Sequence, residues 1–215
     1  MNNLKQKGFT LVEIAIVLVI VGLLIGGVLK GQEMITNAKL KRIESDNAGI
    51  AAAMFSYQDR YLQLPGDDSA AEGRFSVYTG FPVVNGNADG SILGVWNVAP
   101  TLDVTAGVTD ETNLFFAHLR ASGLVPGGGT DDTKPTNAYG GQIGIQDGSL
   151  GLSGHVTIFG AIDGPIARIL EGRLDDSDPA GGRVQAGLVA NVMAPGGIPE
   201  ATYSDALRYN MAFRL

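Results

Sequence analysis

The sequence predicts an α+β fold in which a long N-terminal helix, transmembrane in its first half, packs on a small antiparallel β-sheet with loop-rich insertions. Three observations support this class. Residues 9–29 are almost wholly apolar, an amphipathic pattern follows them to about Tyr61, and short segments of alternating polarity lie near the C-terminus. Long runs of helical periodicity predict helices, and short alternating runs predict half-buried strands.

The apolar run at residues 9–29 has the length of a membrane span. It contains one charged residue, Glu13, and about 20 apolar residues are enough to cross a bilayer as a helix. The apolar core of a secretory signal peptide is about 7–15 residues long and ends at an A-x-A-like cleavage site. This run is longer and has no such site. Lys5 and Lys7 precede it. The positive-inside rule therefore places the N-terminus in the cytoplasm and sends the rest of the chain across the membrane.

Glu13 distinguishes this segment from a plain membrane anchor. A carboxylate at the centre of a membrane helix costs about 2.5–3.5 kcal/mol, less near its end, and usually has a functional partner. Thr10 and Glu13 also fit the T-x-x-E pattern of a capping box, in which the glutamate bonds a backbone N–H of the first turn. The residues alone leave both roles open, a local cap and a partner in another molecule.

The helix is expected to continue to about Tyr61. Side chains that recur every three, four or eight residues mark one face of an amphipathic helix. In this sequence they are Ile35, Ile43, Asn47, Ile50, Met54, Tyr57 and Tyr61. A second possibility is a separate helix after a linker, because a glycine inside a helix lowers helix stability by up to about 1 kcal/mol relative to alanine. The interior glycines are Gly22, Gly26, Gly27 and Gly31. Pro65 is expected to end the helix region, because proline lacks an N–H and restricts the residue before it.

Beyond the helix we predict a loop-rich domain with two short helices and three strands. Residues 110–123 have a polar first turn, apolar positions at helical spacing and a terminal glycine, and residues 163–174 have Pro165 in their first turn. The strand candidates alternate in polarity; they are residues 155–159, 183–190 and 207–215. These strands would form a small antiparallel sheet.

Composition and charge argue against several classes of function. The net charge of −7 disfavours nucleic-acid binding, which needs clustered Lys and Arg. The absence of cysteine removes disulfides, thiolate metal sites and cysteine nucleophiles. The sequence also has no G-x-S-x-G elbow, phosphate-binding loop or dinucleotide-binding glycine motif. We therefore expect neither a nucleic-acid partner nor an enzyme.

One loop has the spacing of calcium ligands. Asn85, Asn87 and Asp89 take positions 1, 3 and 5 before Gly90, as in loops of the D-x-D-x-D-G type. The closing glutamate is missing, because position 12 is Trp96. A hard cation would then need another carboxylate, and the candidates are Asp67, Asp68 and Asp103. The same residue types are typical of an ordinary tight turn, which is the alternative.

Other polar residues predict structure rather than chemistry. Asp175, Asp176 and Asp178 follow a predicted helix and precede a proline and glycines, as solvated loops do. His118 and His155 are each isolated, with no second ligand at metal-binding spacing. We expect an acidic loop and two histidines of the core or the surface.

The heptapeptide Lys7-Gly8-Phe9-Thr10-Leu11-Val12-Glu13 resembles the type III signal of type IV prepilins and type II secretion pseudopilins. The resemblance implies that a prepilin peptidase and N-methyltransferase cuts between Gly8 and Phe9 and methylates Phe9, and that Glu13 directs assembly. The freed amine of Phe9 would supply a cation for Glu13 of a neighbouring subunit. It also implies a leader at residues 1–8, an N-terminal helix at 9–61 with its transmembrane and polymerisation segment at 9–29, and a pilin-like domain at 62–215.

By the same resemblance the chain is a structural subunit, a pilin or pseudopilin, of a type IV pilus or a type II secretion filament. It would cross the inner membrane once, N-in and C-out, and then join identical or related subunits in a periplasmic or extracellular filament. The alternative is an exported adhesive or ligand-binding module, or an enzyme, that uses only a pilin-like anchor. No cofactor is expected apart from calcium at Asn85, Asn87 and Asp89.

Overall fold

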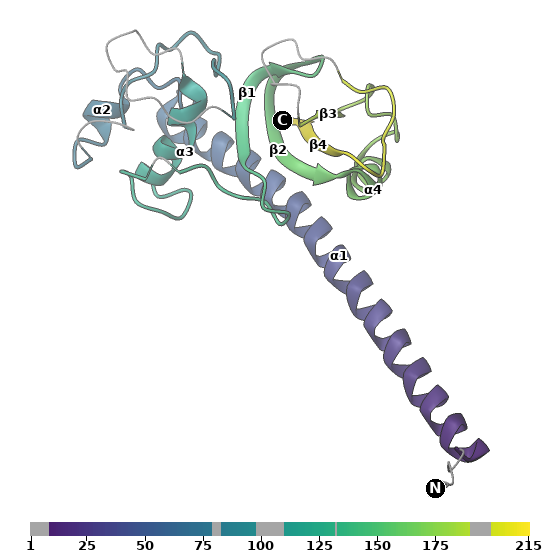
Figure 1. Ribbon diagram of the computed structural model, residues 1–215. Coiled ribbons are helices and arrows are strands. Elements are labelled where there is room, and N and C mark those ends of the chain that lie inside the picture. The colour runs from purple at the N-terminus through teal and green to yellow at the C-terminus, as the bar shows by residue number, and fades with distance from the viewer. Residues whose placement is uncertain (1–8, 79–82, 98–109, 132, 190–198) are drawn as a thin grey trace, which may run out of the picture. The chain divides into compact units, whose positions relative to one another are not determined.

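The structure is a computed structural model that describes residues 9–78, 83–97, 110–131, 133–189 and 199–215. Its elements are α1 (Leu11–Tyr61), α2 (Ala71–Arg74), α3 (Glu111–Ala121), β1 (Ile143–Ser149), β2 (Leu152–Asp163), α4 (Gly164–Leu174), β3 (Val184–Leu188) and β4 (Arg208–Arg214) (Figure 1). A long N-terminal helix followed by a four-stranded antiparallel sheet confirms the predicted α+β, pilin-like fold. The chain divides into two compact units, residues 1–41 and 42–215.

In the first unit, α1 runs without interruption through the four glycines of its apolar half. A Cβ atom added at Gly22, Gly26, Gly27 or Gly31 would meet no atom within 4 Å. The helix therefore does not need these glycines for close approach within the chain, and the alternative of a separate helix after a linker is wrong.

In the second unit, residues 42–61 of α1 bury the predicted amphipathic face. Ile43, Ile50, Met54 and Tyr57 are buried, whereas Ile35, on the same predicted face but in the first unit, is 60% exposed. Thr157 Oγ1 in β2 donates a hydrogen bond to Asn47 Oδ1, so this part of the helix packs on the sheet. The helix ends at Tyr61, where Leu62 takes a positive φ of 57° that an α-helix cannot continue.

The sheet has the strand order β1-β2-β4-β3, and all its pairings are antiparallel. Strands β2, β3 and β4 lie on the three segments predicted from alternating polarity, and Ala190 of the second one lies outside the described residues. Helices α3 and α4 lie on the two predicted short helices. Strand β1 and the one-turn helix α2 were not predicted.

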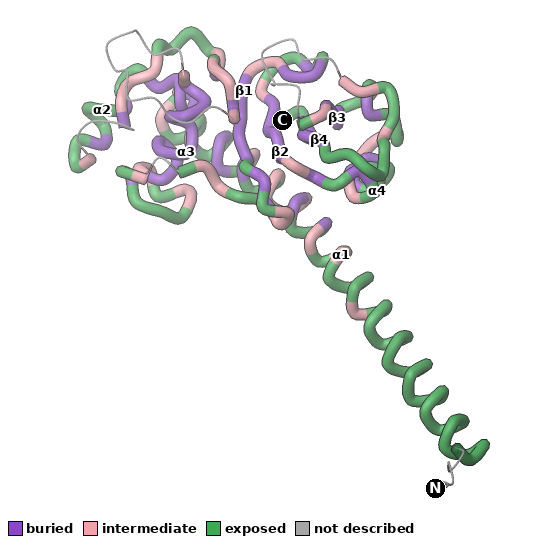
Figure 2. The backbone as a smooth tube through the Cα atoms, viewed as in Figure 1, coloured by how far each residue is buried: buried purple, intermediate pink, exposed green. Residues whose placement is uncertain are grey.

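Both faces of the sheet are buried (Figure 2). One face packs with Trp96 in a cluster of buried residues; the other members are Leu150, Leu152, Val156, Ile158 and Ala212. Gly144 and Gly160 make room for the indole, since a Cβ atom on either would lie 2.8 Å from a Trp96 carbon. The opposite face carries Phe159 and Phe213, whose rings meet edge to face with centroids 5.3 Å apart.

Candidate functional site

The first turn of α1 is closed by a capping box. Thr10 N and Thr10 Oγ1 each donate to Glu13 Oε2 at 2.8 Å, and Glu13 N donates to Thr10 Oγ1 at 3.3 Å. This geometry satisfies backbone donors that a helix N-terminus otherwise leaves free. Phe9, just before the box, is 83% exposed. Gly8, the other residue of the predicted cleavage site, lies outside the described residues.

Residues 11–29 of α1 are exposed throughout (Figure 2), and most of them are large apolar residues. The exposed fractions of the large apolar residues in this segment run from 43% at Val21 to 87% at Leu11. By length and composition the helix is able to cross a membrane. A helix that is apolar all round is normally buried in protein or in lipid. The segment is therefore typical of a membrane anchor.

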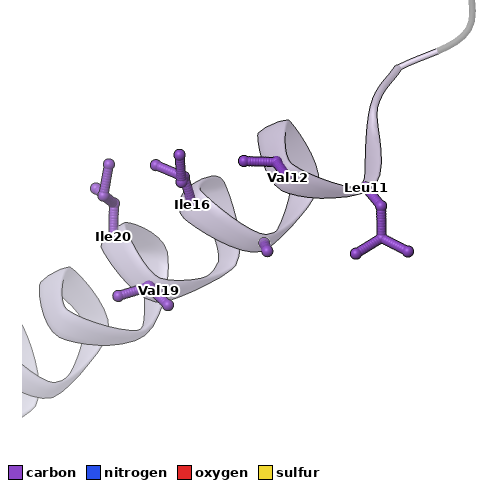
Figure 3. A pocket seen from close by; sticks show the side chains of 6 residues that line it. Leu11, Val12, Ile16, Val19 and Ile20 are labelled. Carbon is purple, nitrogen blue, oxygen red and sulfur yellow. The ribbon is translucent and has the colours of Figure 1, made fainter.

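A shallow apolar hollow lies on the first turns of this segment (Figure 3). Its lining is entirely aliphatic: Leu11, Val12, Ala15, Ile16, Val19 and Ile20. Val12, Ile16 and Ile20 are spaced by four residues and form one ridge along the helix. A surface of this kind offers no hydrogen bond, so it suits lipid chains or another apolar helix.

The loop with calcium-ligand spacing is built from hydrogen-bonded turns. Asn87 Oδ1 accepts a hydrogen bond from Asp89 N at 2.8 Å, and Asp89 Oδ1 accepts one from Ser91 N at 2.9 Å. Asn85 Oδ1 accepts one from Glu72 N, in α2, at 2.9 Å. These contacts are those of the tight-turn alternative. Calcium binding by Asn85, Asn87 and Asp89 stays a prediction.

Asp67 accepts hydrogen bonds from the backbone of the same loop. Its Oδ1 accepts a hydrogen bond from Asp89 N at 3.1 Å, and its Oδ2 accepts one from Gly90 N at 2.9 Å. The backbone carbonyl of Asp67 accepts a third, from Ala88 N at 3.0 Å. The side chain is almost fully buried. Of the two candidate carboxylates in the described part of the chain, Asp67 and Asp68, it is thus the Asp67 side chain that reaches the loop.

Glu111, at the start of α3, is a second carboxylate on this loop, and the sequence did not indicate it. Glu111 Oε1 accepts from Asn87 N at 3.2 Å, and Oε2 accepts from Leu93 N at 3.0 Å. One carboxylate oxygen each from Asp67, Asp89 and Glu111 lie within 4.8 Å of one another. Burial raises the pKa of Glu111 to about 7, although the two backbone donors act in the opposite direction.

The carboxylate of Asp68, another of the candidates, has other partners. Asp68 Oδ2 accepts hydrogen bonds from Tyr57 Oη at 2.7 Å and from Arg74 Nε at 3.1 Å. The buried Asp68 carboxylate thereby connects Tyr57 in α1 to Arg74 in α2, and its ion pair with Arg74 is partly exposed. Asp103 lies outside the described residues.

The two histidines have structural partners. Gly66 N donates to His118 Nδ1 at 2.9 Å, so Nε2 carries the proton and donates to the carbonyl of Val84 at 2.9 Å. Burial lowers the pKa of His118 to about 4. A hydrogen bond and ion pair with Asp147 raise the pKa of His155. Within the described residues neither histidine belongs to a cluster that could hold a metal ion.

Comparison with known proteins identifies the N-terminal segment. The family model described as the prokaryotic N-terminal methylation motif matches residues 3–29. This motif, followed by the long apolar helix, is a type IV prepilin-like signal and indicates a pilin-like or pseudopilin-like precursor. Such a motif is typical of structural rather than catalytic proteins. No curated protein and no solved structure matches the chain.

Proposed function

We propose that the chain is a structural subunit, a pilin or pseudopilin, that assembles through its N-terminal helix into a type IV pilus or a type II secretion filament. The observation that carries the proposal is the exposed apolar surface of residues 11–29, which coincides with the methylation motif at residues 3–29. Exposed apolar surface of this extent needs a partner. Lipid covers it before assembly, and the same segment of other subunits covers it in the filament.

The proposal assigns three successive states to the N-terminus. The chain first crosses the inner membrane once, with residues 1–8 in the cytoplasm. A prepilin peptidase then cuts between Gly8 and Phe9 and methylates Phe9. The processed chain finally joins identical or related subunits in a periplasmic or extracellular filament, with residues 62–215 as its folded domain.

Glu13 is the proposed assembly residue, and its hydrogen bonds are compatible with a second partner. Both donors of Thr10 bond Oε2, so within the described residues Oε1 of Glu13 has no donor. The cleaved Phe9 amine of a neighbouring subunit is a cation of the right size for this oxygen. A charge pair in an apolar helix bundle favours one stacking register, because leaving either charge unpaired costs about 3–5 kcal/mol.

Shearing of the bacterium that produces the chain tests the proposal. Filaments that are sheared from the cell surface, or isolated from the periplasm, should contain the chain without residues 1–8. A Gly8→Glu variant, which blocks close approach of the peptidase, should leave the chain in the membrane fraction. If the wild-type chain stays in the membrane while filaments of other subunits are recovered, it is not a filament subunit.

A further inference from the structure

A second group of carboxylates lies where α4 ends. Glu171 is in the last turn of the helix, and Asp175 and Asp176 follow directly after it. One carboxylate oxygen from each of the three lies within 4.8 Å of the others. Among the described residues none of the three forms an ion pair with Lys, Arg or His. The C-terminal end of a helix is itself partly negative, which adds to the negative potential here.

Glu171 carries a buried oxygen that the described part of the chain leaves without a hydrogen bond. The residue is fully buried, and its Oε2 accepts a hydrogen bond from Tyr203 Oη at 3.0 Å. Its Oε1 is also buried and has no donor among the described residues. A buried carboxylate oxygen without a partner is unfavourable, and a hydrogen-bond donor or a cation would stabilise it.

The neighbouring carboxylates are held in position by the loop that follows α4. Asp175 Oδ2 accepts hydrogen bonds from the backbone N–H groups of Arg183 and Val184, where β3 begins. Asp176 Oδ1 accepts the N–H of Asp178 at 2.9 Å. One oxygen of each carboxylate is thereby fixed, which leaves the other oriented by the same contacts.

Glycine at positions 181 and 182 lets the backbone approach these carboxylates closely. A Cβ atom at Gly182 would lie 2.1 Å from Asp175 Oδ2, and one at Gly181 would lie 3.1 Å from Asp176 Oδ2. Gly182 also has a φ of +65°, which favours glycine. A side chain at position 182 would therefore displace the Asp175 carboxylate.

We propose that Glu171, Asp175 and Asp176 bind a calcium ion at the connection between α4 and β3. Three carboxylates supply the hard oxygen ligands and the negative charge that calcium needs, and water or main-chain carbonyls complete a shell of about 6–8 oxygens. The ion gives Glu171 Oε1 its missing partner and ties the end of α4 to the start of β3. Magnesium fits less well, because it requires regular octahedral geometry that an irregular loop does not provide.

Calcium titration of the full-length chain in detergent micelles tests this site. After metal is removed with a chelator, calorimetry with calcium chloride should show binding, and the thermal midpoint should rise. Asp176→Asn keeps the hydrogen bond to Asp178 N through its amide oxygen, so it should fold and yet bind at least tenfold more weakly. Glu171→Gln should have the same effect on binding. Asp59→Asn, an equal change of charge at an exposed position in α1, should bind as the wild type does.

Three results would overturn the proposal. The first is a wild-type chain with no heat of binding and no midpoint change. The second is Asp176→Asn that binds with wild-type affinity and stoichiometry. The third is binding lost in Asp89→Asn and retained in Asp176→Asn, which would assign the ion to the loop at residues 85–93 instead. Magnesium chloride, titrated in parallel, should bind at least tenfold more weakly than calcium.

Discussion

Thr10 and Glu13 bond each other reciprocally at the start of α1, with Thr10 N donating to Glu13 Oε2 at 2.8 Å and Glu13 N donating to Thr10 Oγ1 at 3.3 Å. The glutamate is therefore a cap of its own helix before any other subunit is present. In the proposed filament it also bonds the Phe9 amine of a neighbour. These two roles are separable, because a cap needs only an oxygen and the pair needs a charge.

A glutamine at position 13 would separate the capping role of Glu13 from its proposed role in assembly. Glu13→Gln retains the capping-box pattern but removes the charge, so we expect a folded chain whose recovery in sheared filaments, beside wild type, falls by about a hundredfold or more. Glu13→Ala should fall as far. Glu33→Gln is the matched control, because Glu33 lies on the same helix and forms an exposed ion pair with Lys30; it should assemble normally. Normal assembly of Glu13→Gln would reduce the residue to a cap.

His118 is expected to stay neutral to about pH 4. Its folded pKa of about 4 lies below the ordinary value of 6.5, so between these pH values the unfolded chain binds a proton that the folded chain does not. The free energy of unfolding contributed by this group therefore falls by about 3 kcal/mol as the pH drops from 7 to 4. Imidazole NMR shifts give the pKa directly, and His155→Gln assigns the signal because the chain has two histidines. A His118 pKa near 6.5 would contradict the buried, neutral assignment.

Gly144 should not tolerate alanine. A Cβ atom there would lie 2.8 Å from Trp96 Cβ, and overpacking of this kind costs about 1–3 kcal/mol. Gly49→Ala is the contrast, because Gly49 lies in α1 with open space around it and alanine in a helix is favoured over glycine by up to about 1 kcal/mol. Denaturant unfolding in detergent should show opposite shifts for the two variants. Equal shifts would place Trp96 elsewhere.

Asp89→Asn tests the calcium prediction for Asn85, Asn87 and Asp89. If this loop binds calcium together with Asp67 and Glu111, the variant should lose one bound ion per chain while Asp59→Asn loses none. If the loop is only a turn, calcium binding should be unchanged in Asp89→Asn. The variant should then lose no more than about 1 kcal/mol of stability, because its hydrogen bonds are exposed.

The sequence predicts the elements that local pattern determines. Helix α1 follows from its apolar run and amphipathic continuation, and β4 follows from the alternation of its side chains. Strand β1 was not predicted because Gly144, Asp147 and Gly148 are of residue types that are depleted in strands. Gly144 lies against Trp96, and the backbone N–H of Trp96 donates a hydrogen bond to Gln146 Oε1, 50 residues away in the sequence. No local pattern reports such a contact.

The same limit applies to the candidate sites. Glu111 lies in the first turn of a helix, where a carboxylate ordinarily caps its own helix, and only the tertiary fold turns it to residues 87 and 93. Glu171 could have been recognised, since it lies in the last turn of α4, four residues before Asp175, which follows the helix. What sequence could not show is that its Oε1 is buried with no donor in the described part of the chain.

Mass spectrometry of the mature N-terminus tests the central claim most directly. The account predicts a chain from the producing bacterium that begins at Phe9 and carries one methyl group on its α-amine. A mature chain that still begins at Met1, with residues 1–8 intact, would contradict it.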